Sequence, residues 1–228
     1  MCGRYTLKTP AERVAELFGI EPLTDLVPRY NIAPAQPIAL VRQKEIGLGR
    51  EMVWGRWGLV PSWAKDSSGA ARAINARSES AREKPSFRSS FARRRCLVPA
   101  DGFFEWKADG KKKNPFYVRF DDGRLFAMAG LWDRWNKDGS SLETATILTT
   151  AASSGLRSLH DRMPVILPPD RYDDWLTGRA AEEILVSMDD PHFVPIPVSS
   201  VVNSARHEGP DCIAPADPQT TDGQPTLW

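Results

Sequence analysis

The middle of the chain consists of short apolar runs separated by turn residues, and this pattern limits the fold more than any other feature. The run from Cys96 to Trp106 is interrupted by Pro99 and Gly102. Two further runs, residues 116–120 and 125–129, flank the sequence Asp-Asp-Gly-Arg, which is typical of a hairpin turn. Runs of this length bounded by turn residues favour strands over helices. The pattern therefore predicts a sheet with mainly antiparallel connections.

Helices are expected at fewer places. Thr9-Pro10-Ala11-Glu12 fits a capping box with proline at the first helical position, and Gly19 ends the apolar repeat that follows. A second short helix is expected near residues 169–176. Residues 144–150 are β-branched and predict a buried strand.

The domain organisation follows from the same pattern. The 228 residues contain no internal repeat and no linker that would divide them. We expect one α+β domain over residues 1–213, built mainly on antiparallel sheet. Proline, aspartate, glycine and threonine dominate beyond Glu208, and residues 214–228 are expected to form a flexible tail.

Cysteine and histidine usage argues against several classes of protein. The three cysteines are far apart and form no CxxC pair, so neither a disulfide framework nor a structural zinc site is expected. The three histidines form no HExxH motif, and we expect neither a metal nor another cofactor. No apolar run approaches a membrane span, and the first residues lack the apolar core of an export signal. A cytoplasmic protein is expected.

The near-neutral net charge of +1 hides a local asymmetry. The stretch from Arg72 to Arg95 contains eight lysines and arginines, and only Glu79 and Glu83 oppose them. Such a stretch can attract a polyanion, although charge alone favours a solvated charged face.

Cys2 offers chemistry that an internal cysteine lacks. Removal of Met1 would leave an α-amine and a thiol on the same residue. The amine can condense with an aldehyde to an imine, and the thiol can then close a five-membered thiazolidine ring. An α-amine with a pKa of about 7.7–8.0 is also a better nucleophile at neutral pH than a lysine. Taken alone, however, Cys2 is more simply explained as a small residue after the initiator.

Other segments hold single residues suited to acid–base work or to anions. Glu105 lies among aromatic residues, which can raise its pKa, or it faces outward from a strand. His160 can move protons near neutral pH, or it is a structural hydrogen-bond partner. Asn75 and Arg77 suit a phosphate, or they belong to a loop or helix start. Trp63, bounded by proline and polar residues, is either a stacking platform for a base or a core residue.

Taken together, six segments in order resemble the SRAP family, the SOS response-associated peptidase domain of abasic-site sensors. The segments are Met1–Tyr5, Tyr30–Pro34, Trp57–Trp63, Ile74–Glu79, Arg95–Trp106 and Leu159–Pro164. Each segment is weak alone, but six in order make a specific match.

This resemblance implies a curved, mainly antiparallel sheet or barrel with flanking helices, and a basic groove that ends at Cys2. It implies an abasic-site sensor that crosslinks to single-stranded DNA through a thiazolidine at Cys2 after Met1 is removed, and so shields the lesion in the DNA damage response. It also implies site residues: Cys2, Asn75, Glu105 and His160 in catalysis, with Arg4, Pro34, Trp63, Arg77 and Thr150 along the DNA.

Two other functions stay open on the sequence. A cysteine peptidase acting on other proteins would use Cys2 as nucleophile and His160 as base. A noncatalytic single-strand-binding module would need only Trp63 and the arginines. In each case we expect a monomer without a membrane partner, and for the DNA-binding functions an association with the nucleoid.

Overall fold

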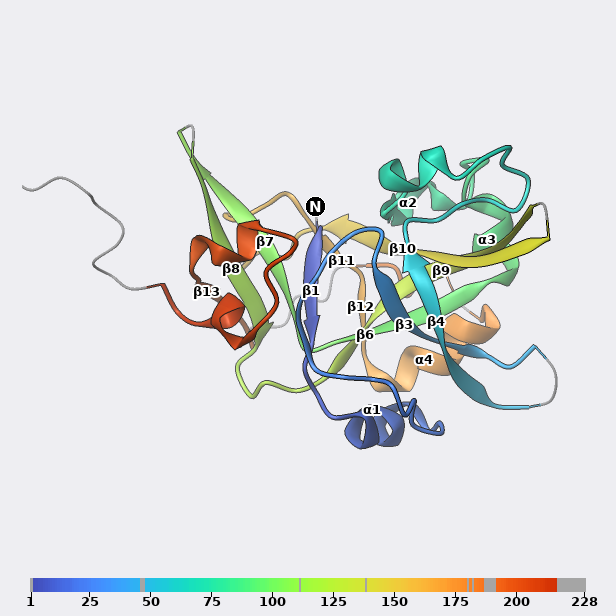
Figure 1. Ribbon diagram of the computed structural model, residues 1–228, viewed down its shortest axis with the longest axis horizontal. Helices are drawn as coiled ribbons and strands as arrows, with labels where there is room; N and C mark the ends of the chain where they lie inside the picture. Colours follow the sequence, from blue (N-terminus) through green and yellow to red (C-terminus); the bar gives the residue numbers. More distant parts are fainter. Residues whose placement is uncertain are drawn as a thin grey trace, which may run out of the picture.

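The computed structural model describes residues 2–45, 48–110, 112–137, 139–179, 181, 183–186 and 192–216. These residues form a five-stranded sheet and an eight-stranded sheet (Figure 1). The smaller sheet is antiparallel and has the strand order β13 (Phe193–Pro197), β8 (Lys112–Phe120), β7 (Gly102–Asp109), β1 (Arg4–Leu7) and β2 (Arg29–Ile32).

The larger sheet closes into a barrel. Its strands, in spatial order, are β11 (Arg162–Pro164), β10 (Ser140–Ala151), β4 (Arg50–Trp57), β3 (Pro37–Gln43), β6 (Arg95–Ala100), β9 (Phe126–Lys137) and β12 (Ile166–Leu167). Strand β10 pairs with β4 on one side and with β9 on the other, so the path returns to its start. A short strand, β5 (Asn75–Arg77), joins β10 in parallel. Apart from the β10 pairings with β4 and β5, the described pairings are antiparallel.

Helices are short and lie outside the barrel (Figure 1). They are α1 (Ala11–Phe18), α2 (Ser78–Ala81), α3 (Arg88–Arg93) and α4 (Tyr172–Thr177), with 3-10 turns at Ser68–Arg72, Pro169–Arg171, Ser200–Asn203 and Pro210–Ile213. The α+β class, the antiparallel barrel and the flanking helices predicted from the sequence are thereby confirmed.

The helix predicted after Thr9 is confirmed as α1, but its capping box is wrong. Gly19 ends the helix in the left-handed conformation with φ 62°, as glycine permits. At the other end Pro10 is the N-cap, and no side chain caps the helix. The Thr9 hydroxyl instead donates a hydrogen bond to Asp101, because this buried carboxylate competes for it.

The predicted hairpin over residues 116–129 is also wrong. Both runs are strands, but β8 pairs with β7 and β13, whereas β9 pairs with β6, β10 and β12. The turn at Gly123 therefore carries the chain from one sheet to the other. Phe120 and Phe126, on either side of it, are buried and meet edge to face with centroids 5.6 Å apart. The turn residues fix the reversal of the chain but not its strand partner.

The apolar run from Cys96 to Trp106 divides in the same manner. It forms β6 of the barrel and β7 of the smaller sheet, and Asp101 lies at the junction. The carboxylate of Asp101 is buried and accepts hydrogen bonds from the Thr6 hydroxyl at 2.5 Å, from the Lys8 and Thr9 amides at 2.7 and 2.9 Å, and from the Thr9 hydroxyl. One side chain thus holds the end of β1 to the point where the two sheets meet.

We predict that Asp101→Ala lowers the free energy of unfolding by about 3 kcal/mol or more. The substitution leaves several donors without an acceptor, and each buried unsatisfied group costs about 1–3 kcal/mol. Urea unfolding measures the effect, with Asp122→Ala in the exposed turn as the matched control. A loss equal to that of the control would show that Asp101 does not hold the two sheets together.

The segment after β13 packs against the smaller sheet. Arg4 donates to the carbonyl oxygens of Val202 and Asn203, and Asn31 Nδ2 donates to those of Ser204 and His207. The predicted domain end at residue 213 falls within this packed structure, and the Ala216 amide still donates to Pro197 O. Residues 217–228, most of the predicted tail, lie outside the described residues.

Candidate active site

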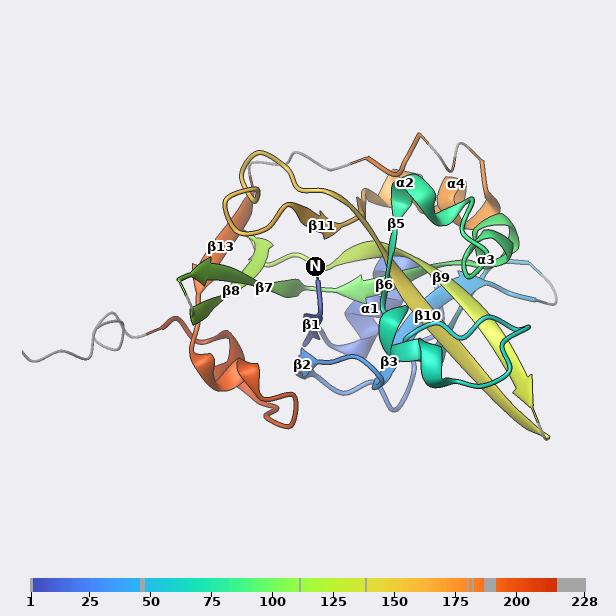
Figure 2. The same cartoon turned by 90° about the horizontal axis from the view of Figure 1, so that it is seen from above.

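The start of β1 lies between its neighbour β7 in the smaller sheet and the strands β10 and β11 of the barrel (Figure 1, Figure 2). The register pairs Arg4 with Phe104, so the residues before Arg4 run alongside the end of β7 that carries Glu105. Strand β5 brings Asn75 to the same place from the barrel, since it pairs with β10. The segment before β11 contributes His160. Both sheets therefore supply residues to one site.

Asn75 contacts the first described residue directly. Its Nδ2 donates a 2.7 Å hydrogen bond to the carbonyl oxygen of Cys2. Its Oδ1 is buried and has no hydrogen-bond partner among the described residues. The amide thus holds one polar group of residue 2 and presents an acceptor beside it.

The thiol of Cys2 is fully buried. Its Sγ donates to Arg4 O at 3.7 Å. Burial raises the pKa of the Cys2 thiol, and the negative charge of Glu105 raises it further. The thiol is therefore protonated at neutral pH.

Glu105 is a buried carboxyl group and not the outward-facing strand residue that was the alternative. Its side chain belongs to β7 and is 4% exposed, whereas its neighbour Trp106 faces the C-terminal segment and donates to Asn203. Burial raises the pKa of Glu105 to about 7; the hydrogen bond from the Trp106 amide opposes this increase, and the charge of Asp161 adds to it. The group can therefore take up or release a proton near neutral pH.

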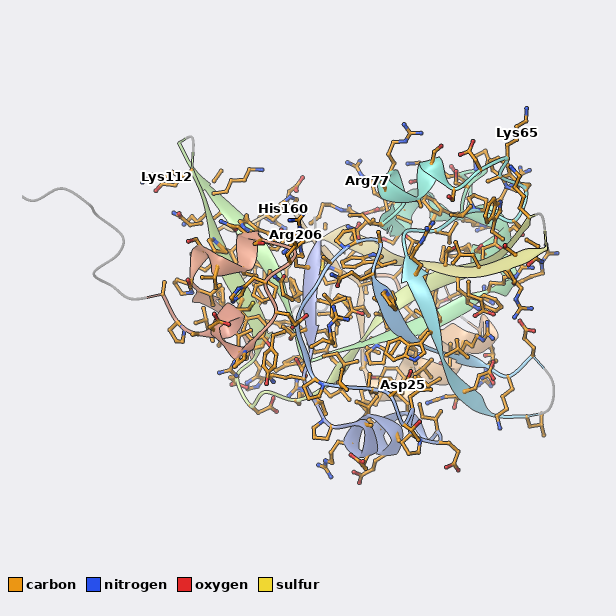
Figure 3. The ribbon with its side chains drawn as sticks, in the orientation of Figure 1. Asp25, Lys65, Arg77, Lys112, His160 and Arg206 are labelled. Carbon is orange, nitrogen blue, oxygen red and sulfur yellow. The ribbon has the colours of Figure 1, made fainter. Side chains whose placement is uncertain are left out.

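His160 is half-buried and points toward the upper edge of the molecule beside the start of β1 (Figure 3). Its Nδ1 accepts a 2.9 Å hydrogen bond from the Arg162 amide and lies 2.7 Å from Asp161 Oδ1. The Arg162 amide can donate to Nδ1 only when the ring is neutral, whereas the Asp161 carboxylate pairs with Nδ1 only when the ring is protonated. Burial lowers the pKa of His160, so the neutral form predominates at pH 7 and leaves Nε2–H as the remaining donor.

The predicted DNA-contacting residues differ in their surroundings. Trp63 is 65% exposed, on a turn anchored by the Ser62 amide to Asp133, and Arg77 is exposed beside α2 (Figure 3). The side chains of the other three are more enclosed. Arg4 is half-buried and donates to Asn31 and Val202, Pro34 is half-buried in a turn, and Thr150 is buried at the end of β10.

The basic stretch serves two purposes. Arg94 pairs with Asp133 at 2.8 Å, and Arg95 donates to Trp175 O at 2.8 Å, so both stabilise the fold. The remaining members are exposed: Arg72, Arg77, Arg82, Lys84, Arg88 and Arg93. These six are the side chains of the stretch that face solvent.

Sequence reasoning did not single out the ion pair next to His160. The Arg162 guanidinium makes two hydrogen bonds to Glu79, at 2.6 and 2.9 Å, and contacts Thr149 O. This pair joins the segment of His160 to α2, which directly follows the strand of Asn75. The opposite charges were visible, but their separation of 83 residues gave no sign that they meet.

Met1, whose removal would free the α-amine of Cys2, lies outside the described residues. Among the described residues, no helix is long and apolar enough to cross a membrane.

The family model of the SOS response associated peptidase (SRAP) matches residues 1–205. The chain is 39% identical over 223 residues to the abasic site processing protein YoqW of Bacillus subtilis, covering 93% of this chain and 99% of that one. It is 32% identical over 227 residues to YedK of Escherichia coli, covering 94% and 100%. It is 33% identical over 226 residues to HMCES of Gallus gallus, covering 83% and 67%. The last two are also named abasic site processing proteins.

Solved structures agree with the sequence relatives. A protein from Bacteroides thetaiotaomicron superposes with a TM-score of 0.83 at 28% identity, covering 94% of this chain and all of that one. A protein from Bordetella bronchiseptica gives a TM-score of 0.74 at 29% identity, covering 87% and 100%. The sequence and the fold lead to the same assignment: this chain belongs to the SOS response associated peptidase (SRAP) family.

Proposed function

We propose that this protein processes abasic sites in single-stranded DNA by bonding covalently to them through Cys2, and so shields the lesion during the response to DNA damage. The observation that carries the proposal is the surroundings of residue 2, where Asn75 holds the carbonyl and Glu105 has a pKa of about 7. The names of the relatives, abasic site processing proteins, support the same substrate.

The chemistry balances without a cofactor. An abasic sugar in its open form presents an aldehyde. The α-amine of Cys2, freed by hydrolysis of the Met1–Cys2 bond, adds to the aldehyde and releases one water to give an imine. The thiol then adds to the imine carbon, and its proton moves to the nitrogen. The product is a thiazolidine, and no oxidant or reductant is consumed.

The neighbouring groups have distinct tasks in this proposal. Asn75 holds residue 2 through its carbonyl, and its buried Oδ1 accepts a hydrogen bond from the new α-amine. Glu105 takes a proton from the ammonium and steadies the imine, and it positions water for the removal of Met1, an autocatalytic step. His160 gives a proton to the sugar oxygen as the ring opens, from the fraction of the ring that is in the imidazolium form.

DNA binding is proposed to depend on phosphates and stacking. Arg77 and the other exposed arginines of the basic stretch neutralise phosphates, and Trp63 stacks on a base. Neither contact reads sequence. Single strands suit the reaction because the sugar is reached without displacing a paired strand. The protein acts as a monomer.

The state of the thiol separates this proposal from a cysteine peptidase. A peptidase of that kind needs a thiolate, and burial raises the pKa of Cys2 instead. The crosslinking route begins with the amine and uses the thiol second, so a protonated thiol is no obstacle.

One experiment distinguishes the three functions. Mature protein is incubated with a single strand containing one abasic site and then run on a denaturing gel. A heat-stable shifted band is expected for the abasic strand and not for an intact strand of the same sequence. DNA binding in a native gel without a shifted band in the denaturing gel would indicate a noncatalytic binding module. If neither gel showed a shift and the protein cleaved a peptide substrate, the function would be that of a cysteine peptidase.

We predict that the rate of crosslinking rises as the pH rises through about 7, because the carboxyl group of Glu105 must be ionised to accept a proton. Glu105→Gln should lower the rate by about 10²–10⁴-fold. Its remaining pH dependence should follow the α-amine, at about pH 7.7–8.0. Gel time courses across pH measure this, with the exposed Glu83→Gln as control. An inflection near pH 7 that survives in Glu105→Gln would remove the carboxyl group from the proposed role.

We also predict that Arg77→Ala weakens binding to all single-stranded sequences alike. Loss of one phosphate contact should lower the slope of log affinity against log salt by about 0.7. Fluorescence anisotropy at several salt concentrations measures it. Arg13→Ala is the matched control, because this exposed arginine lies on α1, at the opposite edge of the molecule from α2 (Figure 1). A change in base preference with an unchanged salt slope would contradict the assignment.

A further inference from the structure

Three side chains of the C-terminal segment lie close together, although their spacing in the sequence fits no known motif. His207, Asp211 and Cys212 place a ring nitrogen, a carboxylate oxygen and a sulfur within 4.8 Å of one another. Among the described residues, this is the one group of three histidine, cysteine or acidic side chains that lie close enough together to hold a metal ion. The spacing matches no standard metal motif, and for that reason no metal was expected from the sequence.

The backbone holds this group in place. The His207 amide donates to Ser204 O at 3.1 Å, and the Cys212 amide donates to Gly209 O at 3.1 Å. Asn31, from β2, donates through Nδ2 to His207 O at 2.8 Å. A Cβ at Gly209 would lie 2.8 Å from Asp211 Oδ1, so the glycine leaves room for the carboxylate to turn toward the histidine.

The three side chains extend from the protein interior to its surface. Cys212 is fully buried and belongs to the small apolar cluster between the smaller sheet and the C-terminal segment. His207 is half-buried, and Asp211 is exposed. The carboxylate is thus the ligand atom that an ion from solvent meets first.

We propose that His207, Asp211 and Cys212 bind a thiophilic divalent cation, Zn²⁺, with water in the fourth position. Thiolate, imidazole and carboxylate are the three ligand types that Zn²⁺ takes in proteins, at about 2.0–2.3 Å. The sulfur ligand disfavours Ca²⁺ and Mg²⁺, which prefer oxygen. Tetrahedral binding requires that the 2.7 Å contact between His207 Nε2 and Asp211 Oδ2 opens to admit the ion, and that the Cys212 thiol gives up its hydrogen bond to His207 O.

Binding exchanges one proton for the metal. The Cys212 thiol loses its proton to solvent as the Zn–S bond forms. Affinity for Zn²⁺ should therefore increase with pH as the released proton is taken up by buffer.

The site lies in the segment that Arg4 and Asn31 attach to the smaller sheet. In Figure 2 this segment, residues 199–216, lies beside β1, β2 and β8. An ion bound to the folded segment stabilises it against opening, because a ligand that binds the folded state alone shifts the equilibrium toward that state. The bound ion therefore stabilises the packing of this segment against the smaller sheet, whose strand β7 carries Glu105.

A second histidine–aspartate pair provides the matched control. His192 Nδ1 lies 2.9 Å from Asp121 Oδ2 on the same protein, but no thiol joins that group. If His207 and Asp211 formed only a surface ion pair, the two pairs would respond to metal alike. If Cys212 completes a site, only the first pair responds.

The test uses the full-length protein stripped with a chelator and then titrated with Zn²⁺ against a chromophoric chelator. We expect one equivalent to bind, and Co²⁺ to give the near-ultraviolet absorption of a cobalt–thiolate bond. His207→Ala and Cys212→Ser should weaken binding by more than about 100-fold, the upper range for loss of a mere supporting contact. His192→Ala should bind as the parent does.

Cys2 needs its own control, because a free α-amine beside a thiol also chelates metals. Cys2→Ala should retain the full equivalent and the cobalt absorption if the site is at Cys212. Loss of binding in Cys2→Ala, or unchanged binding in His207→Ala, would overturn the proposal. Circular dichroism of each variant before titration confirms that it is folded. If Cys212→Ser does not fold, the half-buried His207→Ala still tests the proposal.

Discussion

Cys2→Ala is expected to abolish the heat-stable crosslink and to leave noncovalent DNA binding within a few-fold of the parent. The thiol closes the thiazolidine ring, and the substitution removes only that atom from a buried position. Denaturing gels measure the crosslink, and anisotropy measures binding. The other two cysteines are buried and free, so Cys96→Ala and Cys212→Ala are the matched controls and should crosslink normally.

The same variant allows the two steps of the reaction to be separated. Cys2→Ala still carries an α-amine, and we expect a reductant that traps imines to restore a covalent band. Cys2→Ala with the reductant and the parent without it should therefore give bands of similar mobility. An undiminished heat-stable band from Cys2→Ala without reductant would show that the thiol is dispensable.

A permanent extension before Cys2 is expected to abolish the crosslink completely, although every side chain of the site is retained. The nitrogen of Cys2 is then an amide, and its lone pair is delocalised into the preceding carbonyl. It cannot condense with an aldehyde, and the thiol alone gives only a reversible hemithioacetal. Native gels should still show DNA binding by the extended protein.

The control for the extension is the same sequence with a cleavable junction immediately before Cys2. Treatment with the matching protease should restore crosslinking to the level of the parent. If the uncleaved protein formed a heat-stable adduct, the nucleophile would be a cysteine side chain alone, and the peptidase-like mechanism would regain support.

The strands were predictable because short apolar runs bounded by turn residues leave little alternative. Their partners were not. The turn at Gly123 was correctly located but assigned to a hairpin, because the sequence does not show that Phe120 and Phe126 pack together while their strands enter different sheets. The capping box failed for a similar reason, since a distant carboxylate, Asp101, attracts the hydroxyl of Thr9. Long-range partners decided both cases.

The residues of the candidate site could be predicted only when they were considered together. Cys2, Glu105 and His160 each had a simpler explanation, and only their joint occurrence in the order typical of a family favoured function. The structure adds what spacing cannot supply, such as the burial that raises the pKa of Glu105 to about 7 and the hydrogen bond from Asn75 to residue 2. The three residues of the proposed metal site were missed because no motif contains their spacing.

The most direct test of the central claim is the intact mass of the purified adduct with a short abasic strand. A thiazolidine at the N-terminus predicts the mass of the chain from Cys2 to Trp228 plus that of the strand, minus one water. The mass should be unchanged by a reductant that traps imines, because ring closure has consumed the imine. An adduct that retains Met1, or one that keeps the water, would contradict the mechanism.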